Sequence, residues 1–224
     1  MGDTGEIPLL FKGFRLMLIY WHRLHTLPNE SLVKKALNEN VQMRTSWIRI
    51  IEKLFNLFQI TYSENTNTFK ARTKHSVDQK YLKMWDHHLR HLDQPRLEFF
   101  KKIKNTFGYE CYLDLKHFEI RKSITKLRSS SHPLEIEKGR HSNKPRNERL
   151  CPVCNLNEVE TEKHFLTKCP TYNMLREIYN LTEITNENDV MTRTPPNLLG
   201  HYTFEAFKYR EMTIDILSST KGHI

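Results

Sequence analysis

The apolar residues of this chain recur mostly at intervals of three and four, which is the spacing of one face of an α-helix. The first such stripe begins after Pro8 and predicts a helix there. Further stripes follow at 32–37, after a break at 28–31, and at 47–58. Three helices with short connections predict a small helical bundle over residues 1–60. The members of the first stripe are Leu10, Phe14, Met17, Trp21 and Leu24.

The next part of the chain is polar and then periodic again. Residues 61–76 are rich in Asn, Thr and Lys and lack periodicity, so they predict a linker or an exposed loop. Helical spacing returns and is interrupted at Pro95, which predicts a helical hairpin and connector over 77–117. The connector alternates weakly at 109–115 and is expected to be extended, with Cys111 buried and chemically inert.

The last hundred residues contain further helical patterns. Ile120, Ile124 and Leu127 predict a helix over 118–128 that ends before a break, with a restart at Pro133. Residues 138–149 have a loop-like composition, and 172–181 are again helical in pattern. Within 182–224 we expect a loop at 186–196 and a final amphipathic helix over 204–217.

Three cysteines and a histidine lie in one short segment as Cys-x2-Cys-x9-His-x4-Cys. They are Cys151, Cys154, His164 and Cys169. A tetrahedral Zn²⁺ needs four thiolate or imidazole donors, and a close Cys-x2-Cys pair can supply two of them from one turn. The spacing predicts one structural zinc per chain in a compact knuckle, provided that the helix carrying His164 ends before Cys169. Pro170 is consistent with that ending.

Three other interpretations of this cluster are weaker. The cysteines could be small buried residues gathered by chance, or Cys151 and Cys154 could be a redox pair, although no strand running into a helix surrounds them. A metallohydrolase would need an open coordination position, which four protein ligands do not leave. The predicted fold is therefore mainly α: a helical bundle and hairpin, a basic helix and zinc-knuckle domain at 118–181, and C-terminal helices.

Charge adds a candidate partner. The chain carries a formal net charge of +9, and 120–149 hold nine basic residues against three acidic ones, a surplus of +6. A charge surplus is often only a solubilising surface. Because this one adjoins the cysteine cluster, we expect it to bind the phosphates of a nucleic acid. The basic residues are Arg121, Lys122, Lys126, Arg128, Lys138, Arg140, Lys144, Arg146 and Arg149.

The sequence also bears on the compartment. The longest apolar run, residues 16–21, is much shorter than the roughly twenty residues that span a bilayer, so no membrane association is expected. Acidic residues near the start and the lack of a small-residue cleavage site argue against a signal peptide. We expect an intracellular protein, cytoplasmic or nuclear and not secreted, whose cysteines bind metal in a reducing environment.

Residues 123–176 resemble the C-terminal region of LINE-type (non-LTR) retrotransposon reverse transcriptases. The resemblance is carried by the Cys-Cys-His-Cys spacing and by the segments LEIEKGR at 134–140 and CP at 169–170. It implies a basic helix leading into a zinc knuckle downstream of a polymerase. More weakly, residues 20–24 and 45–47 look like the helical region between thumb and knuckle. A reverse transcriptase polymerase region is accordingly a possible partner.

The chain lacks the residues for polymerase chemistry. It contains no Asp-Asp pair to hold two metal ions, no phosphate-binding glycine loop and no metalloprotease motif. We therefore expect a non-enzymatic zinc-knuckle tail, similar to part of a reverse transcriptase, that binds RNA or single strands in preference to duplex DNA. The alternative is a zinc-stabilised protein-interaction module with no nucleic-acid role.

Overall fold

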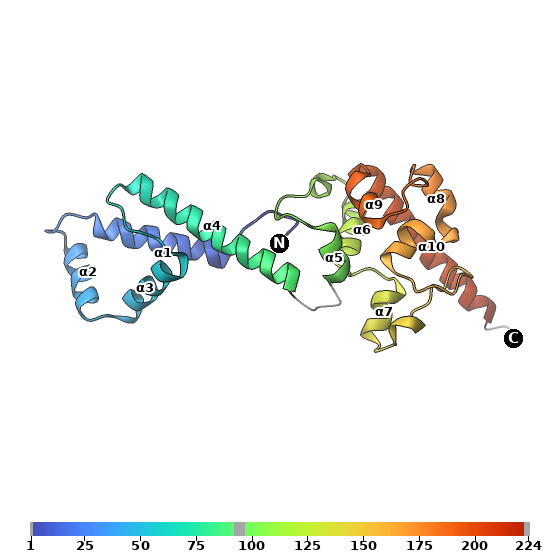
Figure 1. Ribbon diagram of the computed structural model, residues 1–224, viewed down its shortest axis with the longest axis horizontal. Helices are drawn as coiled ribbons and strands as arrows, with labels where there is room; N and C mark the ends of the chain where they lie inside the picture. Colours follow the sequence, from blue (N-terminus) through green and yellow to red (C-terminus); the bar gives the residue numbers. More distant parts are fainter. Residues whose placement is uncertain (1, 92–96, 222–224) are drawn as a thin grey trace. The chain divides into compact units, whose positions relative to one another are not determined.

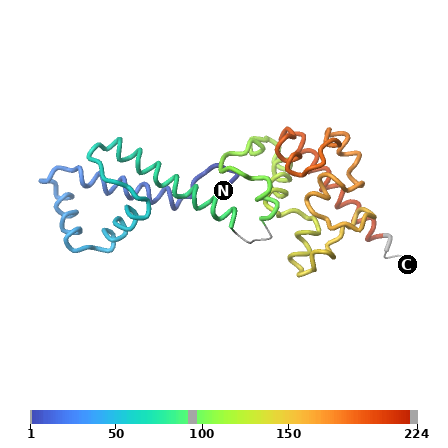
Figure 2. Tube along the Cα trace, viewed as in Figure 1, coloured from blue at the N-terminus to red at the C-terminus, as the bar shows by residue number. Residues whose placement is uncertain are grey.

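The computed structural model describes residues 2–91 and 97–221, and its regular elements are helices (Figures 1 and 2). β pairing within these residues is limited to two isolated bridges, Thr4 with Tyr109 and Leu150 with Val159. The predicted mainly α fold is confirmed. In the part of the chain described, no helix combines the length and the apolar character needed to cross a membrane.

The described residues form two compact units. Unit 1 contains residues 2–91 and 106–109, and unit 2 contains residues 97–105 and 110–221. These boundaries differ from the predicted division of the chain into five consecutive segments, because residues 97–105 belong to unit 2 while 106–109 return to unit 1.

Unit 1 is built from α1 (Leu9–His25), α2 (Leu32–Gln42), α3 (Ser46–Phe58) and α4 (Thr66–His91). The first three match the predicted bundle, and α1 packs lengthwise against α4 (Figure 1). Their apolar faces enclose a core rich in aromatic rings. It consists of Phe11, Leu18, Leu54, Phe58, Ile60, Phe69, Val77 and Tyr81, with a smaller cluster of Leu24, Leu37 and Ile48.

The predicted linker at 61–76 is wrong for most of its length, because α4 begins at Thr66. Phe69, Thr73 and Val77 are spaced four apart along α4, and all three are buried. Phe69 is apolar but Thr73 is polar, so the sequence shows no apolar stripe in the first turns of this helix. The predicted hairpin over 77–117 is also wrong, since α4 belongs to unit 1 and α5 (Glu98–Ile103) to unit 2. The expected break at Pro95 lies outside the described residues.

Unit 2 contains α5, α6 (Phe118–Arg128), α7 (Glu135–His141), α8 (Asn173–Ile178), α9 (Glu187–Arg193) and α10 (Pro196–Lys221). The long α10 lies along α6. Gly200 permits this close approach, because a Cβ atom at that position would lie 2.2 Å from Cγ2 of Ile120. The hydroxyls of Ser123 and Thr203 are 2.8 Å apart across the same contact.

Three local predictions in unit 2 need correction. Residues 109–115 are not extended but contain the short 3-10 helix η2 (Cys111–Asp114). The expected loop at 186–196 contains α9, whose N-terminus is capped by Asn186, since its side chain accepts a hydrogen bond of 2.8 Å from the Asn188 amide. α10 begins at Pro196 instead of 204, because Leu199 and Tyr202 are buried and extend the apolar face.

Candidate metal centre

Cys151, Cys154, His164 and Cys169 meet in unit 2, and their ligand atoms all lie within 4.8 Å of one another. The Sγ atoms of Cys151 and Cys169 are 3.9 Å apart, and Sγ of Cys154 is 3.4 Å from Nε2 of His164. Zn–S bonds of about 2.3 Å place two tetrahedral sulfur ligands about 3.8 Å apart. The four donor atoms therefore have the separations of a four-coordinate metal site.

A short hairpin presents the first two ligands. The Cys151 amide donates to the Glu158 carbonyl, and the Glu160 amide donates to the Arg149 carbonyl, each at 2.9 Å. Asn157 has a positive φ of 52° in the turn between these pairs, a conformation that asparagine tolerates well. Local backbone bonding thus brings the Cys-x2-Cys segment back against the chain that follows it.

A wide helical turn presents the other two ligands. The element η4 (His164–Lys168) is a π-turn, in which the Cys169 amide donates to the His164 carbonyl at 2.8 Å. An ideal α-helix would place residues five apart on different sides. The wide turn brings His164 and Cys169, which are five residues apart, to the same side. The helix ends before Cys169 and Pro170, as the sequence predicts. His164, Cys151 and Cys169 are all buried.

Glu158 fixes the orientation of the histidine. Its Oε2 lies 3.2 Å from Nδ1 of His164, which leaves Nε2 facing the sulfur of Cys154. Lys168 pairs with the same carboxylate at 3.2 Å. Hydrogen bonds with Lys168 and His164 hold the pKa of Glu158 below its usual range. A carboxylate behind a histidine ligand is a common support of metal sites, and no sequence spacing identified Glu158 in this role.

The protonation pattern of the metal-free cluster favours a cation. The hydrogen bond with Cys151 lowers the pKa of the Cys169 thiol to about 4, and the same contact, with burial, raises the pKa of Cys151. Burial also raises the pKa of Cys154. Cysteine binds metal as a thiolate, so a cysteine whose pKa is raised loses its proton when a cation binds. Metal binding at this cluster therefore releases protons.

A buried ion pair connects the hairpin to α10. Arg210 of α10 donates to both carboxylate oxygens of Glu160, at 2.7 and 2.6 Å, and Glu160 also accepts from the Glu135 amide at 2.7 Å. Both side chains of the pair are at most 2% exposed. No sequence motif identified Glu160 in this role. Its partner lies fifty residues away, and no local pattern indicates it.

The basic residues predicted to bind phosphate do not form one continuous strip. Arg128 is buried, pairs with Glu110 at 3.3 Å, and places its guanidinium 5.3 Å from the centre of the Tyr112 ring. Its expected role as a surface contact is therefore wrong, because the core of unit 2 encloses it. Arg121 donates to the Leu115 carbonyl, and Arg149 donates to two backbone carbonyls.

The remaining basic residues lie in two concave surfaces and a loop. Arg140 and Arg146, together with Arg149, line a cavity of about 190 Å³ beside α5, where Arg140 pairs with Glu137 and Arg146 with Glu98. Lys122, Lys126 and Lys138 line a larger groove of about 670 Å³. Lys144 is exposed in the loop after α7.

Cys111 is exposed, so the expectation that it is buried is wrong. It lies outside the four-residue cluster, as predicted. Comparisons of the chain with protein-family models, with curated proteins and with solved structures yield no match.

Proposed function

We propose that unit 2 is a zinc-stabilised module that binds RNA or other single-stranded nucleic acid and has no polymerase activity of its own. The observation that carries the proposal is the cluster of three sulfur donors and one nitrogen donor at tetrahedral separations. This donor set is typical of structural zinc, and four protein ligands close the coordination sphere. The metal would therefore stabilise the fold and take no part in a reaction.

Charge supports the nucleic-acid partner. Residues 120–149 carry a surplus of +6 within a chain of +9. Although Arg128 is buried, Lys126, Lys138 and Lys144 remain exposed. The resemblance of residues 123–176 to the tail of LINE-type reverse transcriptases supports the same conclusion and suggests a retrotransposon origin. Single strands are favoured over duplex DNA because the knuckle presents short turns instead of a long base-reading helix.

One purified sample tests both parts of this proposal. Elemental analysis should give one zinc per chain in reducing buffer. RNA binding, measured by fluorescence anisotropy, should weaken linearly in log affinity against log salt, by about 0.7 per phosphate contact. A zinc-free sample would refute zinc binding. Zinc-loaded protein that does not bind RNA at low salt would refute nucleic-acid binding. Template-dependent primer extension that a point change in this chain abolishes would refute the non-enzymatic part.

A specific observation favours a second candidate, a zinc-stabilised protein-interaction module. Leu9, Leu16 and Tyr20 lie on one stripe of α1 and are 83%, 62% and 53% exposed. Apolar side chains gathered on one helix face often mark a protein contact. Concentration-dependent self-association in the absence of RNA binding, relieved by Leu16→Lys, would make this candidate the better one.

A further inference from the structure

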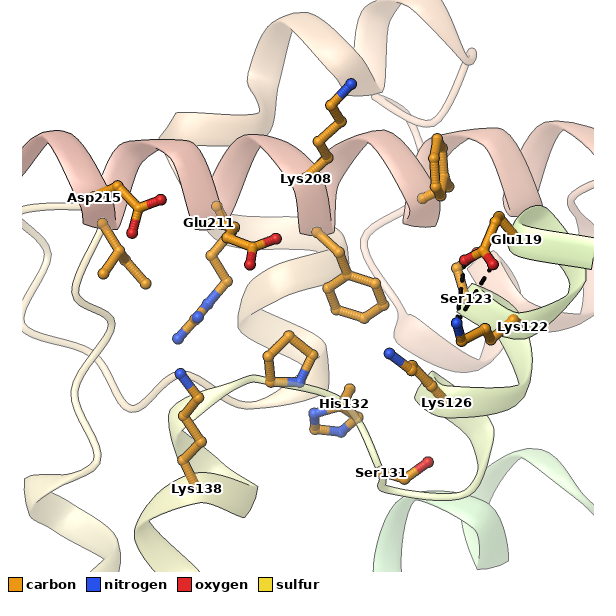
Figure 3. A pocket seen from close by; sticks show the side chains of 15 residues that line it. Glu119, Lys122, Ser123, Lys126, Ser131, His132, Lys138, Lys208, Glu211 and Asp215 are labelled. Atoms are coloured by element: carbon orange, nitrogen blue, oxygen red, sulfur yellow. Dashed lines mark hydrogen bonds and ion pairs between the residues drawn. The ribbon is translucent and has the colours of Figure 1, made fainter.

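The groove in unit 2 lies between α6, α10 and the segment that leads into α7 (Figure 3). Lys126 and Lys138 reach into it from the side of α6 and α7, and Glu211 and Asp215 lie on the opposite side, on α10. Lys208 also borders the groove, but its ammonium group points away from the other labelled side chains. Lys126 and Lys138 thus face Glu211 and Asp215 across an open space. Arg210 also lines the α10 wall, but its charge is paired with Glu160.

Within the described residues, Lys126, Lys138, Glu211 and Asp215 form no ion pair, whereas Lys122 pairs with Glu119 at 3.3 Å. Unpaired ammonium and carboxylate groups can each form charge-assisted hydrogen bonds with a ligand. The open space therefore suits a ligand with an anionic side for the lysines and hydrogen-bond donors for the carboxylates.

The groove also offers apolar and polar contacts. Phe204 lines it and is half-buried, with no ring partner in the described part of the chain. His132 lines it as well: its side chain is fully buried, its Nε2 is 3.1 Å from Glu162, and its Nδ1 has no protein partner within the residues described. A buried polar atom without a partner has lost its hydrogen bonds to water without replacement, so a ligand group that hydrogen-bonded to Nδ1 would gain affinity.

We propose that this groove holds a short run of single-stranded nucleic acid, with its phosphates toward Lys126 and Lys138 and its base edges toward Glu211 and Asp215. The inference rests on the proposed function and adds the surface, the orientation and a base preference. From Phe204 to Asp215, α10 extends about 16 Å at 1.5 Å per residue. That length suits an extended strand better than a single small anion.

The base preference follows from hydrogen-bond chemistry. Ionised carboxylates accept hydrogen bonds and cannot donate them. Cytosine and adenine present amino groups on their edges, whereas uracil presents a single donor, N3–H, between two acceptor oxygens, and its O4 would face Glu211 or Asp215 with like polarity. The groove should therefore bind cytosine-rich strands more tightly than uracil-rich ones.

The test uses the zinc-loaded full chain and two labelled RNA oligomers of equal length, oligo(C) and oligo(U), at several salt concentrations and neutral pH. We expect about a tenfold preference for oligo(C), which corresponds to about 1.4 kcal/mol. The variant Glu211→Gln/Asp215→Asn should reduce that preference to less than about twofold, since amide groups accept and donate. Lys126→Gln/Lys138→Gln should weaken both oligomers and flatten the salt slope by about 1.4 while the preference remains.

The control Lys53→Gln/Lys70→Gln removes equal charge from exposed positions of unit 1. It should change neither the preference for oligo(C) nor the salt slope. Acylation of wild-type lysines gives a readout that needs no variant: RNA should protect Lys126 and Lys138 but not Lys53 and Lys70.

If RNA binds with the expected salt slope but the groove variants behave like the control, the groove proposal is wrong and the proposed function stands. If zinc-loaded protein binds no RNA, the proposed function itself fails. If an oligo-aspartate peptide protects Lys126 and Lys138 from acylation and RNA does not, the groove is an acidic-peptide site and the proposal is overturned.

Discussion

At the scale of single residues, side chains outside the ligand set hold the metal cluster in place. Glu158 orients His164 from behind, and Arg210 neutralises the buried carboxylate of Glu160 next to Cys151. Neither residue touches the position of the metal, and each acts through a partner with a defined geometry. Two substitutions test what these side chains contribute, one to metal affinity and the other to the stability of unit 2.

We predict that Glu158→Gln weakens zinc binding by about 10- to 100-fold, because the carboxylate no longer fixes the histidine ring or increases its basicity. Competition with a chromophoric chelator measures the affinity. Glu183→Gln, at an exposed position elsewhere in unit 2, is the matched control and should leave affinity unchanged. Equal affinities for both variants would show that the Glu158 contact is incidental.

We predict that Arg210→Met destabilises unit 2 by about 3–5 kcal/mol, because Glu160 is left as a buried charge without its partner. Urea unfolding followed by far-UV circular dichroism measures the free energy of unfolding. Arg193→Met is the control: Arg193 pairs with Asp189 on the surface of α9, and its loss should cost less than about 1 kcal/mol. Similar losses for both variants would contradict the importance of the buried pair.

At the scale of helices, the contact between α6 and α10 organises unit 2. The two helices supply opposite sides of the groove, and their contact helps to set the position of Arg210 next to Glu160. The contact depends on a glycine at the crossing, where Gly200 lies against Ile120 and Ile124. A side chain at this position would force the two helices apart.

We predict that Gly200→Ala destabilises unit 2 by about 1–3 kcal/mol, because the added methyl group overlaps with Ile120. Ile120→Ala in the same chain should recover part of that loss, and the double-mutant cycle measures their coupling. Gly13→Ala in α1 provides a contrast, since nothing lies within 4 Å of its new Cβ. It should stabilise unit 1 by about 0.5–1 kcal/mol. A stabilising Gly200→Ala would contradict the close packing.

At the scale of the whole molecule, the described residues divide into two compact units, and the candidate metal cluster found among them lies in unit 2. Structural zinc sites contribute directly to folding free energy, so metal loss should act on the unit that contains the site. The tryptophans Trp21, Trp47 and Trp85 all lie in unit 1. Their fluorescence therefore reports on unit 1 without a contribution from unit 2.

We predict that a strong zinc chelator, or Cys154→Ser, reduces the helical signal in circular dichroism while tryptophan emission keeps its folded wavelength. Cys111→Ser should retain zinc and show neither change, because Cys111 is not part of the cluster. A simultaneous shift of tryptophan emission would mean that both units unfold together. Zinc loss caused by Cys111→Ser would contradict the ligand assignment.

The sequence by itself determined what depends on near neighbours. The cluster that could hold a metal ion could be predicted from its spacing, because a turn and a short helix bring Cys151, Cys154, His164 and Cys169 together within nineteen residues. Helices α1, α3 and α6 could also be predicted from their apolar stripes. The buried face of α1 differs from the predicted stripe, since it contains Phe11 and Leu18 while Leu10 is 62% exposed.

Tertiary structure alone decided what depends on distant partners. The first turns of α4 are helical because Phe69 and Thr73 pack into the core of unit 1, although the local sequence is polar. Arg128 is internal because the folded unit supplies Glu110 and an aromatic ring, and Glu160 is neutralised by an arginine fifty residues away. Burial and charge pairing depend on which elements pack together, and the periodicity of one element does not determine its neighbours.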